Sequence, residues 1–329
     1  MSERSLVIGG TGMIGFNLVR HLILQGECPR VLIRDQSKLN RFAGMNCEIV
    51  FGDVTDKASL VAAMEGIAYV YNTSGMVALG PFLRAKLFEI NVNGVKNILD
   101  AAIERNVRRV VHTSTVSTVG KGSVDRHADE NSVFEDAHLS PYWMSKKAGE
   151  ELALNYAKNA DIEVVVVNPS FVLGPYDFKP TSGEIIIWSK KLGGLPFYAR
   201  GSLNAVHVDD VSLGQIAAMK IGRPGERYIL GNENLTHRQL LDLIAEEIGV
   251  RKPFYRIPYT ANILALIADF LGRFFPEIFN NWNSSMLKVV DVKQYVTCKK
   301  AQIELGLPQT PVRKSIKDAY NWFSQEGRL

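Results

Sequence analysis

A tyrosine and a lysine placed four residues apart have the clearest capacity for chemistry in this sequence. Tyr142 and Lys146 share one face if their segment is a helix, because residues i and i+4 are neighbours on a helix surface. A neighbouring ammonium favours the phenolate, so we expect Lys146 to lower the pKa of Tyr142 from its ordinary value of about 10. A phenol with a lowered pKa can act as a general acid or base near neutral pH.

A glycine-rich loop lies between an apolar run and a segment of helical period. Gly10, Gly12 and Gly15 fit the spacing G-x-G-x-x-G, and Gly9 gives a related spacing with the last two. Such glycines permit a tight turn, a close approach to a pyrophosphate, and packing of helix against strand. The unpaired N–H groups at the positive helix end then hold the phosphates. The loop therefore predicts dinucleotide binding.

The end of the second apolar run bears on which dinucleotide is bound. An acidic residue there accepts the ribose 2′-hydroxyl of NAD, whereas an arginine accommodates the 2′-phosphate of NADP. Arg34 and Asp35 are adjacent, so both types are present, and Lys38 and Arg41 follow closely. Guanidinium groups match phosphate well, and Asp35 can instead cap the next helix. NADP is favoured, and NAD is the alternative.

Six short apolar runs alternate with segments of helical period, as a parallel sheet covered on both faces requires. Thr113, Ser114 and Thr115 end the fifth run, at the edge where such sheets bind ligands. Right-handed crossovers give an α/β fold of the Rossmann type, a doubly wound parallel sheet with helices on both faces. The runs are residues 6–8, 31–33, 48–51, 68–71, 110–113 and 163–167, and the first predicted helix is 13–25.

The regular alternation ends near Gly174, after which glycine and proline are denser. We expect residues 1–174 to form the NAD(P)-binding domain, and residues 175–204 and 222–329 to form a smaller C-terminal substrate-binding subdomain. Residues 205–221 are expected to pack back on the sheet, with Asp209–Asp210 as the N-cap region of a helix.

Composition excludes several classes of function. Lys and Arg number 38 against 34 Asp and Glu, a net charge of +4 without the dense basic stripe of a nucleic-acid binder. Three scattered cysteines indicate a reducing compartment, and six histidines show no metal-ligand spacing. The N-terminus lacks a signal-peptide pattern, and the apolar stretch 260–275 is too short to span a bilayer. We expect a cytoplasmic protein with a small-molecule substrate, and no metal, nucleic-acid partner or integral membrane span.

Further motifs, together with the glycine loop and the Tyr–Lys pair, resemble the extended (atypical) short-chain dehydrogenase/reductase family, which includes NAD-dependent epimerases and dehydratases. The resemblance runs through nearly the whole chain. The motifs are Gly52-Asp53-Val54, Asn72-Thr73-Ser74-Gly75, Asn91-Val92-Asn93-Gly94, the segment 168–175 from Asn168 to Pro175, the segment 206–211, the segment 300–308 and Trp322-Phe323.

The resemblance implies a role for each matching residue. Tyr142 would be the general acid or base, Lys146 would hold the nicotinamide ribose, and Thr115 would hydrogen-bond the reacting oxygen, with Ser114 as its alternative. The implied cofactor-binding residues are Gly9, Gly10, Thr11, Gly12, Met13, Ile14, Gly15, Arg34, Arg41, Asp53, Val54, Asn72, Thr73, Ser74, Gly75, Asn91, Thr113, Ser114, Tyr142, Lys146, Asn168, Pro169, Ser170 and Val172.

Two departures from the family's patterns narrow the reaction. Dehydratases of the family carry Asp-Glu after the catalytic threonine, but Val116-Ser117 follows here. Sugar-nucleotide epimerases usually carry an arginine before the segment 206–211, where this chain has Asn204-Ala205. The chain is more similar to the dihydroflavonol-reductase-like branch, which also contains hydroxysteroid-dehydrogenase-like reductases and hopanoid-associated sugar epimerases.

We therefore expect an NADP-dependent oxidoreductase that reduces a ketone or aldehyde of a small, partly apolar substrate. A sugar-nucleotide epimerase with tightly bound NAD and a non-catalytic NADP-binding regulator are the alternatives. The pocket would be built from loops at residues 76–82, 117–138 and 176–188.

Two apolar features concern the surroundings of the site. The segment 263–275 predicts either a core or lid helix, or an apolar pocket wall or a helix at a lipid interface.

Relatives pair through two long helices, expected here at 83–105 and 142–159, so we expect a homodimer. Its motivating residues are Leu87, Ile90, Ile98, Leu99, Leu152, Leu154 and Tyr156.

Overall fold

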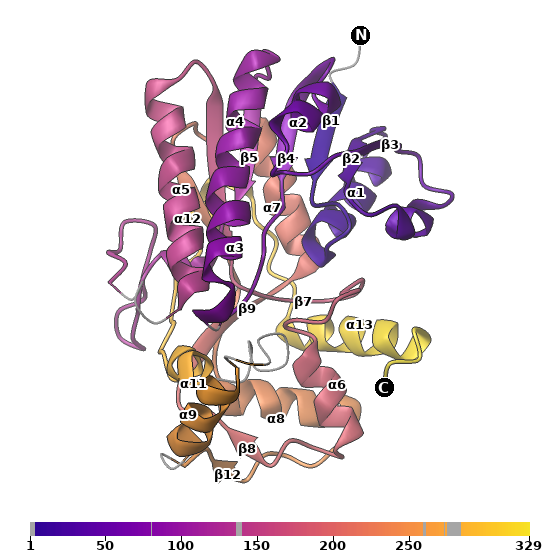
Figure 1. The fold of residues 1–329 in the computed structure, drawn as a ribbon. Helices are drawn as coiled ribbons and strands as arrows, with labels where there is room; N and C mark the ends of the chain where they lie inside the picture. Colours follow the sequence, from indigo (N-terminus) through magenta and orange to yellow (C-terminus); the bar gives the residue numbers. More distant parts are fainter. Residues whose placement is uncertain (1–3, 80, 136–139, 259–260, 273, 275–283) are drawn as a thin grey trace.

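The computed structural model describes residues 4–79, 81–135, 140–258, 261–272, 274 and 284–329, which form two lobes (Figure 1). The larger lobe contains a seven-stranded sheet with helices on both sides. The smaller lobe, at the bottom of Figure 1, is mostly helical. The two lobes meet where the carboxyl ends of the central strands point.

The central sheet has the order β10-β6-β5-β4-β1-β2-β3, and each of its registered strand pairs is parallel. The doubly wound parallel sheet and its six predicted strands are confirmed. The strand order reverses between β1 and β4, where Ile8 is paired with Asn72. Open α/β sheets bind their ligands beyond the carboxyl ends of the strands, at the point where the strand order reverses. The strands are β1 (Arg4–Ile8), β2 (Arg30–Ile33), β3 (Glu48–Phe51), β4 (Ile67–Asn72), β5 (Arg109–Thr113), β6 (Glu163–Pro169) and β10 (Arg227–Leu230).

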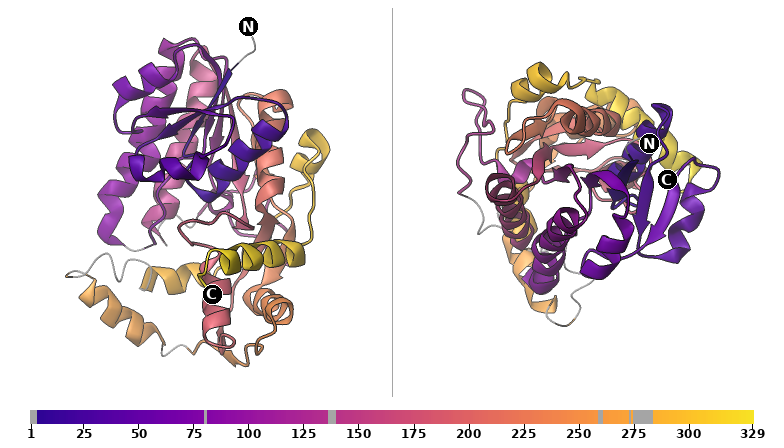
Figure 2. Two further views of the ribbon diagram at one scale, coloured as in Figure 1. Left: turned by 90° about the vertical axis from the view of Figure 1, so that its right-hand side faces the viewer. Right: turned by 90° about the horizontal axis from the view of Figure 1, so that it is seen from above.

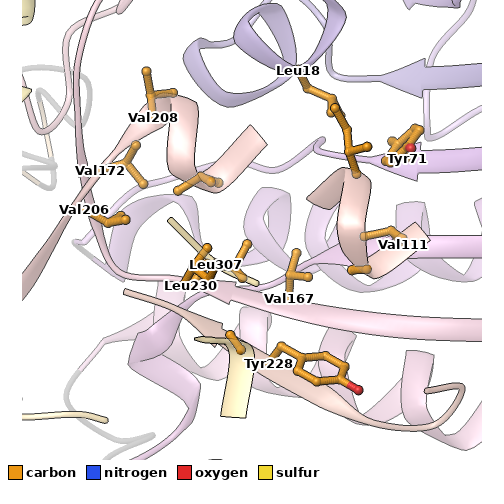
Figure 3. Close-up of a cluster of buried hydrophobic side chains, with 14 of the residues drawn as sticks. Leu18, Tyr71, Val111, Val167, Val172, Val206, Val208, Tyr228, Leu230 and Leu307 are labelled. Carbon is orange, nitrogen blue, oxygen red and sulfur yellow. The ribbon is translucent and has the colours of Figure 1, made fainter. Parts of the chain in front are cut away.

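A run of four valines in β6 shows why the sheet needs two covering layers. Successive side chains of a strand point to opposite faces. Val165 and Val167 accordingly join one buried cluster, while Val164 and Val166 join the other. Figure 3 shows part of the first cluster, in which Val167 and Leu230 lie near Leu307 from the C-terminal region. A strand that is apolar on both faces is stable only between two layers of helices.

The helices that cover the two faces come from distant parts of the chain. The first cluster contains side chains of α1 (Met13–Leu24), α7 (Val208–Ile221) and α12 (Lys299–Leu305). The second contains side chains of α2 (Lys57–Ala63), α4 (Gly94–Glu104) and α5 (Pro141–Asn159). The view from above in Figure 2 shows these helices on opposite sides of the strands.

Two features of the region after residue 200 differ from the sequence expectation. The segment 222–329 was expected in the substrate subdomain, but β10 pairs with β6 as an edge strand of the central sheet, because its buried Tyr228, Ile229 and Leu230 complete the first cluster. Helix α7 does pack on the sheet as expected. Its N-cap, however, is His207, whose ring accepts the N–H of Asp209.

The smaller lobe is organised around a third buried cluster. Helices α6 (Glu184–Lys191), α8 (His237–Ile248) and α13 (Val312–Gln325) enclose it. A three-stranded sheet in the order β11-β9-β7 lies between the lobes. Its strands are β7 (Phe171–Leu173), β9 (Ser202–His207) and β11 (Glu233–Thr236), and a further pair joins β8 (Phe197–Tyr198) to β12 (Tyr255–Arg256).

The apolar segment near residue 265 forms helix α9 (Ala261–Leu271), followed in the described chain by α11 (Ser284–Val290). The core-helix interpretation does not match its burial. Ile263, Leu266, Ile267 and Phe270 are more than half exposed, and Ala265 is buried. Phe275 lies outside the described residues. No described helix combines the length and the apolar character that a membrane crossing requires.

The two long helices of the second layer lie side by side (Figure 1). The expected helix 83–105 consists of α3 (Arg84–Phe88), a π-helical turn η3 (Glu89–Asn93) and α4. Of the side chains that motivated a dimer, Leu87, Ile98 and Leu99 are already buried within one chain. Ile90, Leu152, Leu154 and Tyr156 are partly buried.

Candidate active site

The glycine loop packs tightly between β1 and α1, except at one position. A Cβ on Gly15 would lie 2.4 Å from the carbonyl oxygen of Gly9, and a Cβ on Gly9 would lie 2.7 Å from the backbone nitrogen of Ser74. A Cβ on Gly12 would meet nothing nearer than the Gly9 oxygen at 3.5 Å. Gly12 is the N-cap of α1, without a side-chain cap or an acidic residue in the first turn. The positive end of α1 is therefore open above Gly12, where Met13 and Ile14 begin the helix.

The segment after β4 lies against this loop and is held by its own polar side chains. The Thr73 hydroxyl donates to the carbonyl oxygen of Ile8 at 2.7 Å. The Asn72 oxygen accepts from the backbone and the hydroxyl of Ser74, and its nitrogen lies 3.0 Å from Nδ1 of buried His112. A Cβ on Gly75 would lie 3.8 Å from the ammonium nitrogen of Lys146. Residues 72–75 thus connect the glycine loop with the Tyr–Lys pair.

The basic residues after β2 differ in the groups that they contact. Asp35 caps the 3₁₀ helix η1 (Gln36–Phe42), and Lys38 pairs with it at 3.5 Å. Arg34 pairs instead with Asp53 at 3.2 Å and keeps 66% of its side chain exposed. Arg41 donates to the carbonyl oxygen of Thr11, within the glycine loop, at 2.7 Å. Arg41 therefore lies beside the loop, whereas Arg34 contacts Asp53, which follows β3.

Tyr142 and Lys146 occupy one face of α5, as their spacing predicts. The Lys146 ammonium donates to the carbonyl oxygen of Thr113 at 2.8 Å. The Thr115 hydroxyl is near enough to Tyr142 to favour its phenolate, and its own hydrogen bonds are to the backbone N–H and the hydroxyl of Ser117. The expected direction of the pKa change is wrong. Burial raises the pKa of Tyr142 to about 12, since the loss of solvent disfavours the phenolate more than the Thr115 hydroxyl stabilises it. Burial also lowers the pKa of Lys146 to about 8.

The ends of β5 and β6 place several further predicted residues near this pair. Thr113 accepts from Gln215 of α7 through its hydroxyl, at 2.8 Å. The hydroxyls of Ser114 and Ser170 are buried without a hydrogen-bond partner among the described residues. Ser170 follows Pro169, and Val172 of β7 accepts a bond from Ser182. Buried hydroxyls without partners are rare, so Ser114 and Ser170 are candidates to contact a ligand.

Two residues that were predicted to bind the cofactor, Asn91 and Val54, make their described contacts with other protein groups. The Asn91 side chain lies on the π-helical turn η3, accepts from Met76 N–H at 2.8 Å, and donates to the Met76 carbonyl and the Ser145 hydroxyl. It therefore orients the loop after β4. Val54 contacts Gly94, and its carbonyl accepts from Asn97. The π-helical turn η3 that holds Asn91 is of a kind often found at functional sites.

A buried charged network behind Lys146 was missed at the sequence level. Glu150 is fully buried and accepts from Arg227, Thr118 and Asn168 at 2.6–2.7 Å. Asn168 was predicted to bind the cofactor, but its amide nitrogen also lies 3.1 Å from the carbonyl oxygen of Thr115. The spacing of Glu150, four residues after Lys146, was the signal available in the sequence. No group of three or more His, Cys, Asp or Glu side chains suited to a metal occurs among the described residues.

One family model and several known proteins match most of this chain. The model of the NAD dependent epimerase/dehydratase family matches residues 5–231. The chain is 32% identical to sterol demethylase protein B of Methylococcus capsulatus, over 99% of both chains. It is 33% identical to a putative dihydroflavonol 4-reductase of Synechocystis, over 99% of this chain and 96% of that one. The crystal structure of gox2253 has a TM-score of 0.86 and 31% identity over the whole of both chains.

The matched residues 5–231 run from β1 to the end of β10, so they contain every strand of the central sheet and the Tyr–Lys pair. The chain belongs to the NAD dependent epimerase/dehydratase family, the extended short-chain dehydrogenases/reductases, and is an NAD(P)-dependent enzyme of that family.

Proposed function

We propose that the protein is an NADP-dependent reductase of a ketone or aldehyde in a small, partly apolar substrate. The observation that carries the proposal is the buried ammonium of Lys146, which shares a face of α5 with Tyr142 and donates to the Thr113 carbonyl oxygen at the carboxyl end of β5, two residues before Thr115. A donor phenol next to a second hydroxyl suits a carbonyl oxygen that gains negative charge and then a proton.

The residues present fit a dinucleotide. Gly12 leaves room above the positive end of α1 for a pyrophosphate, and the partnerless Ser114 and Ser170 hydroxyls lie at the strand ends where a nicotinamide would be held. Arg34 and Arg41 are suited to a ribose 2′-phosphate, which favours NADP over NAD. When bound, the reduced nicotinamide supplies the hydride that adds to the carbonyl carbon.

The chain's own residues would act on the oxygen. Thr115 donates a hydrogen bond that orients it, and Tyr142 transfers its phenolic proton to it, which completes the alcohol. Because burial raises the pKa of Tyr142 to about 12, the phenol keeps its proton at neutral pH, so the proton to be donated is present. Lys146 holds a ribose hydroxyl and stabilises the phenolate left after proton transfer.

The surroundings of Asn204 favour reduction over sugar-nucleotide epimerisation. This residue stands near the position where epimerases of the family carry a diphosphate-binding arginine. It is buried, and its amide nitrogen bonds the Asn232 carbonyl and the Asn234 side chain. The similarity to a putative dihydroflavonol 4-reductase also supports a reductase. The proposed location is the cytoplasm, consistent with three free cysteines, Cys28, Cys47 and Cys298.

The first prediction separates cofactor binding from folding. Gly12→Ala should leave thermal stability unchanged, because φ is −86° and the new methyl group meets no close atom. It should weaken NADPH binding by about 1–3 kcal/mol, roughly 5- to 150-fold, by intruding on the pyrophosphate. Gly15→Ala is the contrasting variant and should lose stability. Calorimetric titration of Gly12→Ala with undiminished NADPH affinity would contradict the proposed site.

The second prediction concerns the catalytic group. Tyr142→Phe removes only a hydroxyl, so the protein should fold and bind NADPH while turnover falls by about 10²–10⁴-fold. Thr115→Ser should be nearly silent and Thr115→Val should not, since the hydroxyl carries the role. NADPH oxidation with a panel of aryl ketones, aliphatic aldehydes and steroid ketones gives the readout. Full turnover by Tyr142→Phe would place the chemistry elsewhere.

The third prediction concerns cofactor choice. Arg34→Ala should weaken NADPH by about 1.5–3 kcal/mol, the size of a charge-assisted hydrogen bond, and NADH much less. Lys96→Ala, an exposed cation paired with Asp100 on α4, is the control and should change neither affinity. Equal titration of the unaltered protein with NADPH and NADH would disprove the preference.

The fourth prediction concerns assembly. We propose a homodimer through α3–α4 and α5, which would cover the partly buried Ile90, Leu152, Leu154 and Tyr156. Light scattering at micromolar concentration should give twice the monomer mass of 36.6 kDa. Leu152→Glu should shift the mass towards the monomer, whereas Leu24→Glu, on α1, should not. A monomer mass for the unaltered protein would refute the dimer.

A further inference from the structure

A carboxylate continues the line of the Tyr–Lys pair along α5. Glu150 lies one helical turn beyond Lys146 and two beyond Tyr142, so all three side chains share one face. Its exposed fraction is 0%. A buried carboxylate is costly unless it is paired and its lone pairs are filled. The contacts of Glu150 therefore indicate what this charge holds in place.

Three separate elements supply those contacts. Arg227 of β10 donates from Nη1 to Glu150 Oε1 at 2.7 Å. Thr118, in the 3₁₀ turn η4 (Val116–Thr118), and Asn168 of β6 both lie 2.6 Å from Oε2. Arg227 is fixed in turn by the carbonyl oxygens of Glu130 at 2.7 Å and Ser132 at 3.4 Å. The carboxylate thus joins helix α5 to two strands and to the turn after β5.

That turn begins at Thr115. The Thr118 hydroxyl lies 2.8 Å, and the Asn168 amide nitrogen 3.1 Å, from the carbonyl oxygen of Thr115. Each group that contacts Glu150 Oε2 therefore also contacts the backbone of Thr115. A shift of the carboxylate would move the Thr115 hydroxyl relative to Tyr142, although Glu150 touches neither side chain in the contacts described.

The same carboxylate acts on Lys146 through its charge. Burial lowers the pKa of Lys146 to about 8, and Glu150 raises it. The other titratable groups facing the two residues are His112 of β5, whose pKa burial lowers well below its usual value, Tyr142 and Lys147 of α5, and Arg227. Glu130 contacts β10 through the N–H of Ile229.

We propose that Glu150 is a positioning residue for the reaction: it fixes the Thr115 hydroxyl against Tyr142 through Thr118 and Asn168, and it supports the charged form of Lys146. The inference rests on the proposed reductase function, because it assumes that Thr115, Tyr142 and Lys146 act on the substrate. It goes further in assigning a role to a residue that is remote from the reacting atoms.

The sign of the pH dependence follows from Lys146. The ammonium is charged below its pKa and loses its charge as the pH rises through about 8, whereas Tyr142 keeps its proton over this range. Reductive turnover of the unaltered protein should therefore decline on the alkaline side near pH 8. Removal of the Glu150 charge should move this alkaline limb to lower pH.

The experiment compares Glu150→Gln and Thr118→Val in the NADPH oxidation assay, with a ketone or aldehyde on which the unaltered protein turns over. Glu150→Gln should lower kcat about 10- to 100-fold, as a misplacement of about 1 Å can. The alkaline limb of its profile of kcat against pH should move down by about one pH unit. KM and the NADPH dissociation constant, measured in mildly acidic buffer where Lys146 is charged, should change little. Thr118→Val cuts the link to Thr115 and keeps the charges, so it should lower kcat without moving the limb.

The control is Glu151→Gln, on the exposed side of the same helix, which should match the unaltered protein. Circular dichroism and thermal unfolding establish that each variant is folded at the assay temperature. If Glu150→Gln does not fold, Thr118→Val decides, and an undiminished kcat there overturns the proposal. A folded Glu150→Gln with unchanged kcat and an unmoved limb overturns it as well. So does a loss of kcat matched by an equal loss of NADPH affinity, since that indicates a merely structural role.

Tyr142→Phe in the same assay separates failure of the proposed reductase function from failure of the role proposed for Glu150. Full turnover by that variant removes the proposed function, and this inference fails with it. If Tyr142→Phe loses turnover while Glu150→Gln and Thr118→Val do not, the proposed function stands and the role of Glu150 alone is refuted.

Discussion

Helix α5 has to present a phenol, an ammonium and a carboxylate on successive turns of one face, against the ends of three neighbouring strands. Lys146 contacts the Thr113 carbonyl of β5, with Tyr142 one turn before it on the same face, and Glu150 contacts Asn168 of β6 and Arg227 of β10. On its other side α5 lies close to the π-helical turn η3, because Gly149 has no side chain: a Cβ there would be 2.1 Å from the carbonyl oxygen of Asn91. The position of α5 on the sheet therefore controls the geometry of the whole site.

The sequence was informative where one residue type has few physical explanations. The valine run of β6 requires a sheet covered on both faces, and the glycine spacing after β1 requires close packing of α1, and both arrangements are present. The i, i+4 spacing placed Tyr142 and Lys146 on one helical face for the same reason. Such patterns are local, so they hold before the rest of the chain is known.

What the sequence could not supply depends on contacts between distant segments. The pKa of Tyr142 was expected to fall because Lys146 is near in sequence, but it rises because the surrounding elements exclude water. Glu150 and Arg227 are 77 residues apart, and neither residue type suggests burial. The composition of helix α9 left a core or lid helix, a pocket wall and a helix at a lipid interface open. Leu266 and Phe270 are more than half exposed, and burial depends on what packs against a helix, which composition does not give.

The edge strand β10 has a consequence for how the chain matures during synthesis. It is the seventh strand of the sheet, and its Arg227 neutralises a carboxylate in a helix made 77 residues earlier. A nascent chain that has not yet reached β10 leaves Glu150 with a charge that it can bury only at high cost. Residues 1–174 by themselves lack the cation that pairs with this buried carboxylate. In a chain made from its N-terminus, Arg227 follows only after about two thirds of the polypeptide has been synthesised, so the ion pair of Glu150 is completed late.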